Sequence, residues 1–315
     1  MKLHTLHEPP PAWLGEALER FERQFDYPLG NGGRFSISHG GDYLPFFSAM
    51  GDASVLVAEA GGEVLGTLAR VERWMHCTHA APQQRGVHYL CDLKVSPAAR
   101  CSGLLAHLML EARRQIEQSG VHGCYGIVMN GTGRRPTDYT GRREIPAFQE
   151  LAQIAVLRIS AGEATAAPTA TAAPTATARQ EAARAHSSQR PACILTGGRH
   201  ELRSLMEPLR IADAAWLEDT RRGKRLWTDA GTEMLSAHLS GFHFNDPVQG
   251  ADILRQALHA AQGSGLPALF AAVPQSMAAD LLAEMHGMQV LLAPATIYGH
   301  GLESGHDWWV DTAEI

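Results

Sequence analysis

The residue types best suited to chemistry lie in one short turn, residues 100–105, with the sequence RCSGLL. If a helix starts here, its first N–H groups have no partner within the helix, and the helix dipole makes this end positive. Gly103 has no Cβ, so a ligand can approach the backbone closely, and Arg100 adds a fixed positive charge. Such a turn suits a phosphate or a diphosphate. A strand-to-helix turn that binds nothing would have the same spacing.

The flanking residues predict the elements that position this turn. Polar and apolar side chains alternate over residues 87–95, which is the period of a pleated strand. Pro97 ends that strand because it has no N–H to donate. After the turn, apolar residues recur at spacings of four, three and four, the stripe of an amphipathic helix: Leu105, Met109, Ala112 and Ile116.

In this setting, VSPAARCSGLL resembles the coenzyme A pyrophosphate loop of the GCN5-related N-acetyltransferases, in which Arg or Gln is followed by two residues, Gly, one residue, and Gly or Ala. Arg100 and Gly103 match this pattern, whereas Leu105 replaces the usual small residue. The resemblance covers about residues 53–130 and extends to the order of elements: helix, helix, hairpin, central strand, phosphate loop, helix. A second departure is the irregular, Arg-rich segment 131–143, where the family has a regular helix.

The resemblance implies acyl transfer from acetyl-CoA, as cosubstrate, to a primary amine of a small molecule or peptide. It implies a coenzyme site made of Leu93, Lys94, Val95, Arg100, Cys101, Ser102, Gly103, Leu104, Leu105 and Asn130. The main chain of 93–95 would pair with the pantetheine amides, and the N–H groups of 101–105 would hold the diphosphate. In the family, the central strand and the strand expected at 124–129 splay apart around the coenzyme arm.

Three residues are candidates for catalysis. Asp92, in the central strand, could orient or deprotonate the acceptor amine; the alternative is a local charge pair with Lys94. Tyr125 and Tyr139 could each protonate the departing thiolate, since a phenol has a reference pKa of about 10 and a thiol of about 8.5. The sequence does not choose between the two tyrosines.

The fold expected is a mixed α/β sheet of the acetyltransferase type in two tandem copies. We predict a coenzyme-binding domain at 1–160, a low-complexity Ala/Thr/Pro linker at 161–190, and a degenerate second copy at 191–315. The second copy carries FNDPVQGAD where the first has its Arg-x-x-Gly loop.

Further elements follow from periodicity and turn signals. In the first copy, helices are expected at 12–25 and 44–50 (with Asp42 as N-cap), and strands at 34–38, 54–60, 64–71, 124–129 and 154–159. In the second copy, helices are expected at 202–209, 251–262 and 277–285 (with Ser276 as N-cap), a hairpin at 214–219 and 225–229, and strands at 234–244, 268–273, 290–292 and 296–299.

Composition narrows the class of protein. The chain has 315 residues with 45% hydrophobic side chains, enough for real cores, and its net charge of −6 argues against nucleic-acid binding. No apolar run reaches the roughly 18 residues that span a bilayer, and the N-terminus lacks a signal-peptide core. Five cysteines without paired spacing fit a cytoplasmic protein. His76, Cys77 and His79 have zinc-binding side chains, but no second pair accompanies them, so no metal is expected.

Two other functions stay open. One is an aminoacyl transferase or a transferase that takes its acyl group from a carrier protein, on the same double fold. The other is a non-catalytic module that binds acyl-CoA, which Leu105 and the irregular segment 131–143 favour slightly. The sequence identifies neither the acceptor nor the oligomeric state.

Overall fold

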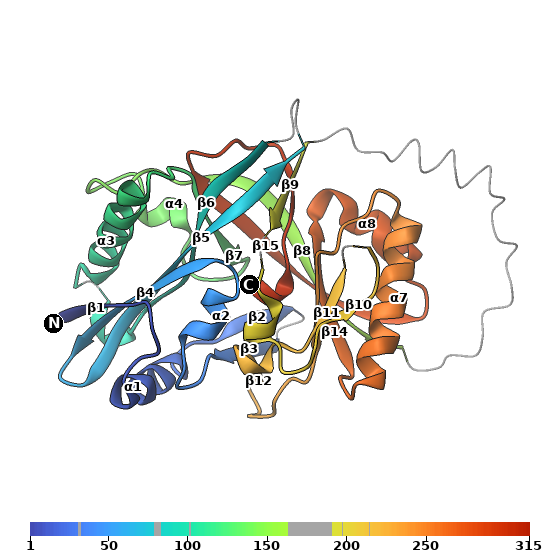
Figure 1. Ribbon diagram of the computed structural model, residues 1–315, viewed down its shortest axis with the longest axis horizontal. Coiled ribbons are helices and arrows are strands. Elements are labelled where there is room, and N and C mark those ends of the chain that lie inside the picture. Colours follow the sequence, from blue (N-terminus) through green and yellow to red (C-terminus); the bar gives the residue numbers. More distant parts are fainter. Residues whose placement is uncertain (31–32, 79–82, 101, 163–190, 197, 214) are drawn as a thin grey trace, which may run out of the picture.

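One mixed β-sheet forms the body of the protein (Figure 1). The computed structural model describes residues 1–315 except 31–32, 79–82, 101, 163–190, 197 and 214. Over these residues the sheet has 13 strands, with the main order β1-β4-β5-β6-β7-β15-β8-β14-β13-β11-β10. The linker expected at 161–190 lies outside the described residues apart from its first two positions.

The first half contains the elements expected around the phosphate loop. Its elements are β1 (Lys2–Leu6), α1 (Ala12–Glu22), β2 (Tyr27–Gly30), β3 (Gly33–Ser38), α2 (Leu44–Ser48), β4 (Asp52–Ala60), β5 (Glu63–Cys77), β6 (Gln83–Val95), the 3-10 turn η1 (Pro97–Ala99), α3 (Leu104–Ser119), β7 (Cys124–Met129), α4 (Pro136–Tyr139) and β8 (Gln149–Ala161). The strand, loop and helix of 87–116 are therefore confirmed. Gly120 ends α3 because its φ of 76° is left-handed, a conformation that glycine adopts without strain.

The second half is more irregular. It contains β9 (Ala192–Thr196), α6 (His200–Arg203), β10 (Leu209–Arg210), β11 (Trp216–Glu218), η2 (Thr220–Arg222), β12 (Arg225–Thr228), β13 (Ala237–Ser240), α7 (Pro247–Gly263), β14 (Ala268–Pro274), α8 (Gln275–Glu284), β15 (Met288–His300), β16 (Asp307–Trp309) and η3 (Thr312–Glu314). The strand–helix–strand–helix order from β13 to α8 confirms the strongest periodic segments of this half.

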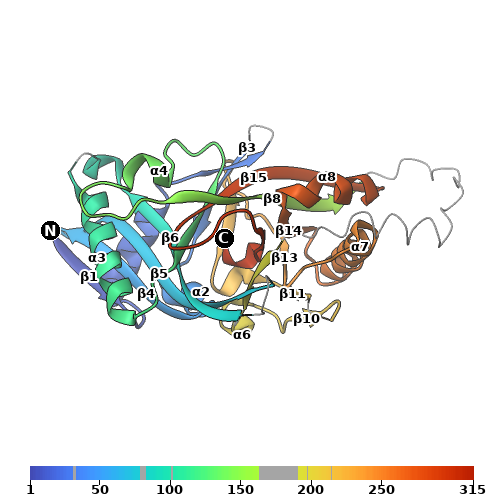
Figure 2. The ribbon, with the colours of Figure 1, turned by 90° about the horizontal axis from the view of Figure 1, so that it is seen from above.

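Two long strands join the halves into one sheet. β8, from the first half, lies between β15 and β14 of the second, and β15 lies between β8 and β7 of the first. Figure 2 shows β15 and β8 running side by side across the middle of the molecule. Every hydrogen-bonded neighbour of β8 therefore comes from the second half.

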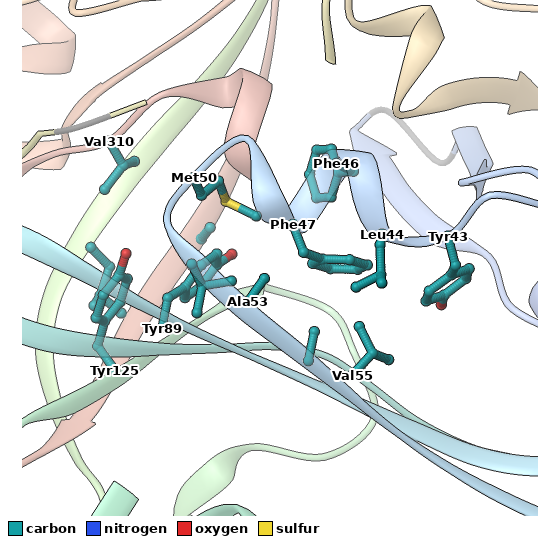
Figure 3. Close-up of a cluster of buried hydrophobic side chains, with 14 of the residues drawn as sticks. Tyr43, Leu44, Phe46, Phe47, Met50, Ala53, Val55, Tyr89, Tyr125 and Val310 are labelled. Carbon is teal, nitrogen blue, oxygen red and sulfur yellow. The ribbon is translucent and has the colours of Figure 1, made fainter. Parts of the chain in front are cut away.

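Alternating side chains of the sheet build separate cores on its two faces. In β4, Val55 and Val57 pack with α1 and α2, while Leu56 and Ala58 pack with α3 on the opposite face. Figure 3 shows the first of these cores, where Phe47 of α2 lies near Val55. In the second half, α7 and α8 cover β8 and β14.

The hairpin expected at 214–219 and 225–229 is wrong. β11 pairs with β10 and β13, whereas β12 pairs with β3 of the first half, in a three-stranded sheet with order β12-β3-β2. The turn between them, which contains η2, is real, but tertiary partners rather than turn chemistry choose the pairing.

Several boundaries and caps also differ from expectation. The helix at 202–209 is only His200–Arg203, and the strand at 234–244 is only Ala237–Ser240. The strands at 290–292 and 296–299 form one strand, Met288–His300, in which Pro294 takes a register position opposite Ala155. The residues at the N-caps are Tyr43 and Pro274, without side-chain caps, rather than Asp42 and Ser276.

Candidate active site

A bulge in the central strand places Asp92. Cys91 of β6 pairs with Ala69 of β5, and Lys94 pairs with Thr67, so the two residues Asp92 and Leu93 lie opposite one residue of β5. Asp92 has a φ of 52°, which is unusual for a residue other than glycine. A β-bulge of this kind interrupts the ladder and redirects a side chain. Here it directs the Asp92 side chain toward a cavity.

The cavity opens where β6 and β7 separate. These parallel strands pair only at His88–Cys124 and Tyr89–Tyr125. Beyond that point, residues 90–93 of β6 and 126–129 of β7 line a cavity of about 290 Å³. Most of its other walls are apolar, and they come from both halves, including β3, β8, β14 and β15. The separation of the two strands, expected from the resemblance, is present in the structure.

A second hollow surrounds the phosphate loop. It is lined by Val95, Arg100, Gly103, Leu104 and Leu105. Gly103 precedes the first residue of α3, has a φ of 82°, and has no atom within 4 Å of where a Cβ would lie. The start of the helix is therefore open to a ligand rather than plugged by side chains. Ser102 accepts a hydrogen bond from the Leu104 N–H at 3.3 Å, and Cys101 lies outside the described residues.

The irregular segment 131–143 borders this hollow and supplies arginines to it. Arg134, Arg142 and Arg143 line it together with Arg100. Four guanidinium groups around one helix start make a strongly positive site, and the charge and fork geometry of arginine suit phosphate oxygens. The segment that departs from the family's helix thus adds positive charge where a diphosphate would bind.

The hollow and the cavity meet. Leu93, Arg134 and Tyr139 line both of them. Tyr139 ends the short helix α4, and burial raises its pKa to about 12. An elongated ligand could therefore lie with an anionic end at Gly103 and its other end beside Asp92.

Hydrogen bonds and one ion pair hold Asp92 in place. Its Oδ1 lies 2.5 Å from Lys94 Nζ, and its Oδ2 accepts hydrogen bonds from the Tyr43 hydroxyl and, at 3.1 Å, from Thr67 Oγ1. The charge pair with Lys94, one of the two readings left open by the sequence, is thus present. It does not remove Asp92 from the cavity, because the carboxylate still contributes to the lining.

A buried acid on α1 completes this cluster. Glu22 accepts from Lys94 Nζ at 3.0 Å and from the His39 N–H at 2.8 Å, and its Oε1 lies 2.6 Å from His39 Nδ1. Burial pushes the pKa of Glu22 up, but the neighbouring His39 and Lys94 outweigh it and hold that pKa at about 2. Burial opposes the charge of Lys94, yet Asp92 and Glu22 raise its pKa above the ordinary value. Ligand atoms of Glu22, His39 and Asp92 converge within 4.8 Å, but the Lys94 ammonium supplies the positive charge there.

The structure separates the remaining candidates. Tyr125 is fully buried, stacks on Tyr89 with ring centroids 4.8 Å apart, and lines neither the cavity nor the hollow. Asn130 lines neither space; its Oδ1 accepts a hydrogen bond from Thr296 Oγ1 at 2.9 Å, which joins β7 to β15. Tyr139 and Asp92 do line the cavity.

Sequence analysis missed Glu22, His39 and Tyr43. Glu22 lies on the otherwise apolar face of α1, which is the one available signal, since an acid on a buried face needs a partner. His39 and Tyr43 carry no such signal, because their contacts with Glu22 and Asp92 span 17 and 49 positions of the chain.

Comparisons with known proteins give a likeness of fold. No family model matches the chain, and no curated sequence does. Structures of Saccharomyces cerevisiae N-myristoyltransferase with bound myristoyl-CoA match it with TM-scores of 0.55 and 0.56, at 11% and 10% identity. They cover 96% and 98% of this chain and 84% and 80% of the yeast chain. A third, with inhibitors, has a TM-score of 0.52 at 9% identity. These structural matches confirm the acetyltransferase-like α/β fold in two tandem halves, which the sequence predicted.

Among the helices of the described residues, none combines the length and the apolar character needed to span a bilayer.

Proposed function

We propose that the protein is an N-acyltransferase that moves an acyl group from acyl-CoA to a primary amine. The observation that carries this proposal is the junction at Leu93 and Tyr139, where the phosphate-loop hollow opens into the cavity beside Asp92. A donor with a diphosphate at one end and a thioester at the other fits that path. The likeness to N-myristoyltransferases solved with myristoyl-CoA agrees with it.

In this proposal the diphosphate binds the N–H groups at the start of α3 and Arg100, with further charge from Arg142 and Arg143. The pantetheine arm runs along the edge of β6 that β7 has left after Tyr89. We propose that main-chain N–H groups of 93–95 pair with its amides and polarise the thioester carbonyl.

The reaction then requires one nucleophile, the amine itself. Its nitrogen attacks the thioester carbon, the C–N bond forms, and the C–S bond breaks. Asp92 orients the amine and takes the proton that the nitrogen releases. The coenzyme A thiolate is the leaving group. Tyr139, which its raised pKa keeps protonated, donates a hydrogen bond to the departing sulfur, and solvent supplies the proton that the thiolate takes up. Tyr125 has no part in this scheme, because it does not line the path.

The simplest acyl group that the donor could carry is acetyl. A longer acyl chain is the second candidate, and the cavity favours it. Its lining includes Phe35, Met109, Met129 and Phe148, far more apolar surface than an acetyl group contacts. A comparison of acetyl-CoA with octanoyl-CoA and myristoyl-CoA separates the two. Each buried CH₂ stabilises binding by about 0.8 kcal/mol, so a longer chain that enters the cavity should bind far more tightly than acetyl-CoA.

The decisive experiment is a thermal shift with acyl-CoA donors on matched glycine variants. Gly103→Glu places a carboxylate in the diphosphate site and should abolish the shift. Gly265→Glu is the control, because Gly265 also has a left-handed φ (78° against 82°) and open space around it, but follows α7. If the rise in melting temperature caused by acyl-CoA were lost in both variants, or in neither, the proposed site would be contradicted.

The rival functions predict different results. A transferase that uses a carrier protein or a charged tRNA would turn over with those donors and not with acyl-CoA. A non-catalytic module would bind acyl-CoA but acylate nothing in an amine panel, and Asp92→Asn would leave its properties unchanged. We place the enzyme in the cytoplasm, on the support of its odd cysteine count.

A further inference from the structure

Arg158 projects from the middle of the shared sheet into the far end of the cavity. It lies on β8, with Phe270 of β14 on one side and Leu291 of β15 on the other, and all three line the cavity. His238 of β13 pairs with Phe270 and extends the same wall. This wall belongs to no part of the coenzyme path described above.

The Arg158 guanidinium has no partner in the part of the chain that the structure describes. Among the described residues it makes no ion pair or hydrogen bond, and its Nε is buried without an acceptor. Burial also lowers its pKa from the ordinary value. A guanidinium remains charged at neutral pH, and leaving a partly desolvated charge unpaired is unfavourable.

The acids of the cavity cannot compensate this charge, because each is committed elsewhere. Asp92 pairs with Lys94, and Glu314 pairs with Arg73 at 2.5 Å and with Arg203 at 3.1 Å. Lys224 also lines the cavity, but burial lowers its pKa to about 7, and its ammonium donates to main-chain oxygens of Thr312 and Ile315. His238 contacts the Thr312 hydroxyl. Among the described residues, this end of the cavity therefore holds no uncommitted acid to pair with Arg158.

We propose that Arg158 binds a carboxylate of the acyl acceptor, so that the acceptor is an amine bearing a carboxylate several bonds away. The inference rests on the proposed function and names the substrate class of the same site. The planar fork of Nε and Nη donors matches a carboxylate in two hydrogen bonds. The other, positively charged end of the path is already assigned to the donor's phosphates.

Sheet register sets the length of such an acceptor. Three strand steps separate β6 from β8, about 14 Å at the usual spacing. Counting three residues on from the last pair of β6 and β7, Tyr89–Tyr125, places Asp92 level with Val128 of β7. Val128 pairs with Thr296 of β15, which pairs with Gln153 of β8. Arg158 is five residues further along (158 − 153), about 17 Å. The backbones are thus on the order of 20 Å apart, and even with both side chains reaching inward, an α-amino acid, whose amine and carboxylate share one carbon, cannot contact both.

The test compares acceptors that differ only in the carboxylate. Glycine oligomers of two to six residues span this range, at about 3.5 Å per residue, and each is used as the free acid and as the C-terminal amide. Binding is measured by calorimetry, with and without coenzyme A, and turnover is measured with an acyl-CoA. We expect one of the longer oligomers to bind about 10- to 100-fold more tightly as the acid than as the amide.

The variants assign that preference to one side chain. Arg158→Met should bind acid and amide equally, and Arg158→Lys should keep part of the preference, because it retains the charge but not the fork. Arg255→Met, which removes an exposed arginine of α7, should keep all of it. Because Arg158 has no partner to lose, the melting temperature of free Arg158→Met should equal or exceed that of wild type.

Several results would overturn the proposal: equal binding of acids and amides by wild type, a preference that survives in Arg158→Met, or a melting temperature of that variant lower by about 5 °C or more. The binding arm needs no turnover. If acyl-CoA neither binds nor reacts, the proposed function fails, while the acid-over-amide preference still decides the role of Arg158.

Discussion

At the scale of single residues, the site depends on a carboxylate held by groups from distant parts of the chain. Asp92 is fixed by Lys94 two positions away, but also by Tyr43 and Thr67, and Lys94 is held in turn by Glu22. The two residues of β6 could be found by sequence pattern alone. Glu22 and Tyr43 could not, because no local signal relates a helix or loop residue to a strand 49 or 72 positions further on.

Asp92→Asn tests the catalytic part of this arrangement. The amide keeps the size of the side chain but cannot take a proton from an amine, so the rate of acyl transfer should fall about 10²- to 10⁴-fold. Acyl-CoA should still bind, since the phosphate loop is untouched. Steady-state rates and donor-induced thermal shifts, measured on the same preparation, check both statements. Full activity in this variant would leave Asp92 with a structural role only.

Glu22 makes the free energy of unfolding of the protein depend on pH. Its pKa is about 2 in the folded protein against an ordinary 4.5, so its carboxylate stabilises the fold above about pH 4.5, and this contribution is lost as pH falls toward 2. Glu22→Gln should therefore lower the free energy of unfolding by on the order of 3 kcal/mol at pH 7. The deficit should shrink by pH 2.5.

Urea unfolding at the two pH values measures that deficit. Glu63→Gln is the control, because Glu63 is an exposed partner of Arg20 at 3.6 Å and such pairs contribute about 0–1 kcal/mol. A Glu22→Gln deficit of the same size at pH 7 and pH 2.5 would contradict the assignment of the low pKa to this residue.

At the scale of elements, the periodicity of the sequence predicted individual helices and strands but not which strands pair with each other. β7 was predicted with its observed bounds, and the stripe predicted from Leu105 to Ile116 lies within α3, because each segment has a regular pattern. The pairing of β12 with β3, and of β8 with β14 and β15, could not be predicted. A period-2 pattern shows which face of a strand is buried, but not which strand lies beside it.

The same limit applies to the cavity. The phosphate loop was predicted from a strand, a turn and a helix that follow one another in the chain. Arg158, which falls in the strand predicted at 154–159, became a candidate only when the sheet placed Phe270 and Leu291 beside it. A binding site assembled from paired strands is visible only once the pairing is known.

Gly126 controls how β6 and β7 separate. It lies just after Tyr125, the last residue of β7 that pairs with β6, and it lines the cavity. A Cβ at this position would lie 2.9 Å from the Leu90 carbonyl oxygen. Since that atom is backbone, Gly126→Ala must shift one strand. We expect a lower melting temperature and weaker donor binding, both measured by thermal shift with and without acyl-CoA.

The matched control is Gly263→Ala, at the end of α7. A Cβ at this position meets no atom within 4 Å, and alanine favours helix over glycine by roughly 1 kcal/mol. That variant should be at least as stable as wild type and should bind donor normally. If Gly126→Ala behaved in the same way, the strands would not need their close approach at this position.

At the scale of the whole molecule, the two halves repeat one order of elements, from β6 to β8 and from β13 to β15, but share one sheet. The boundaries predicted from composition, at 160 and 191, separate β8 from both of its neighbours and β7 from β15. The cavity also draws its walls from both sides of that division. We therefore propose that the halves fold as one cooperative unit around a cavity that neither can form alone.

Fragments 1–162 and 191–315 test this proposal. In the first, β8 would expose both edges and the apolar face that packs against α7 and α8, so the fragment should lack a cooperative melting transition and should not respond to acyl-CoA. Co-expressed, the two fragments should associate and recover the donor-induced shift, because the contacts that join them are strand pairs rather than the connecting residues. Circular dichroism melts of each fragment and of the co-purified pair measure both effects. A fragment 1–162 that melts cooperatively and binds acyl-CoA by itself would instead make the halves independent domains.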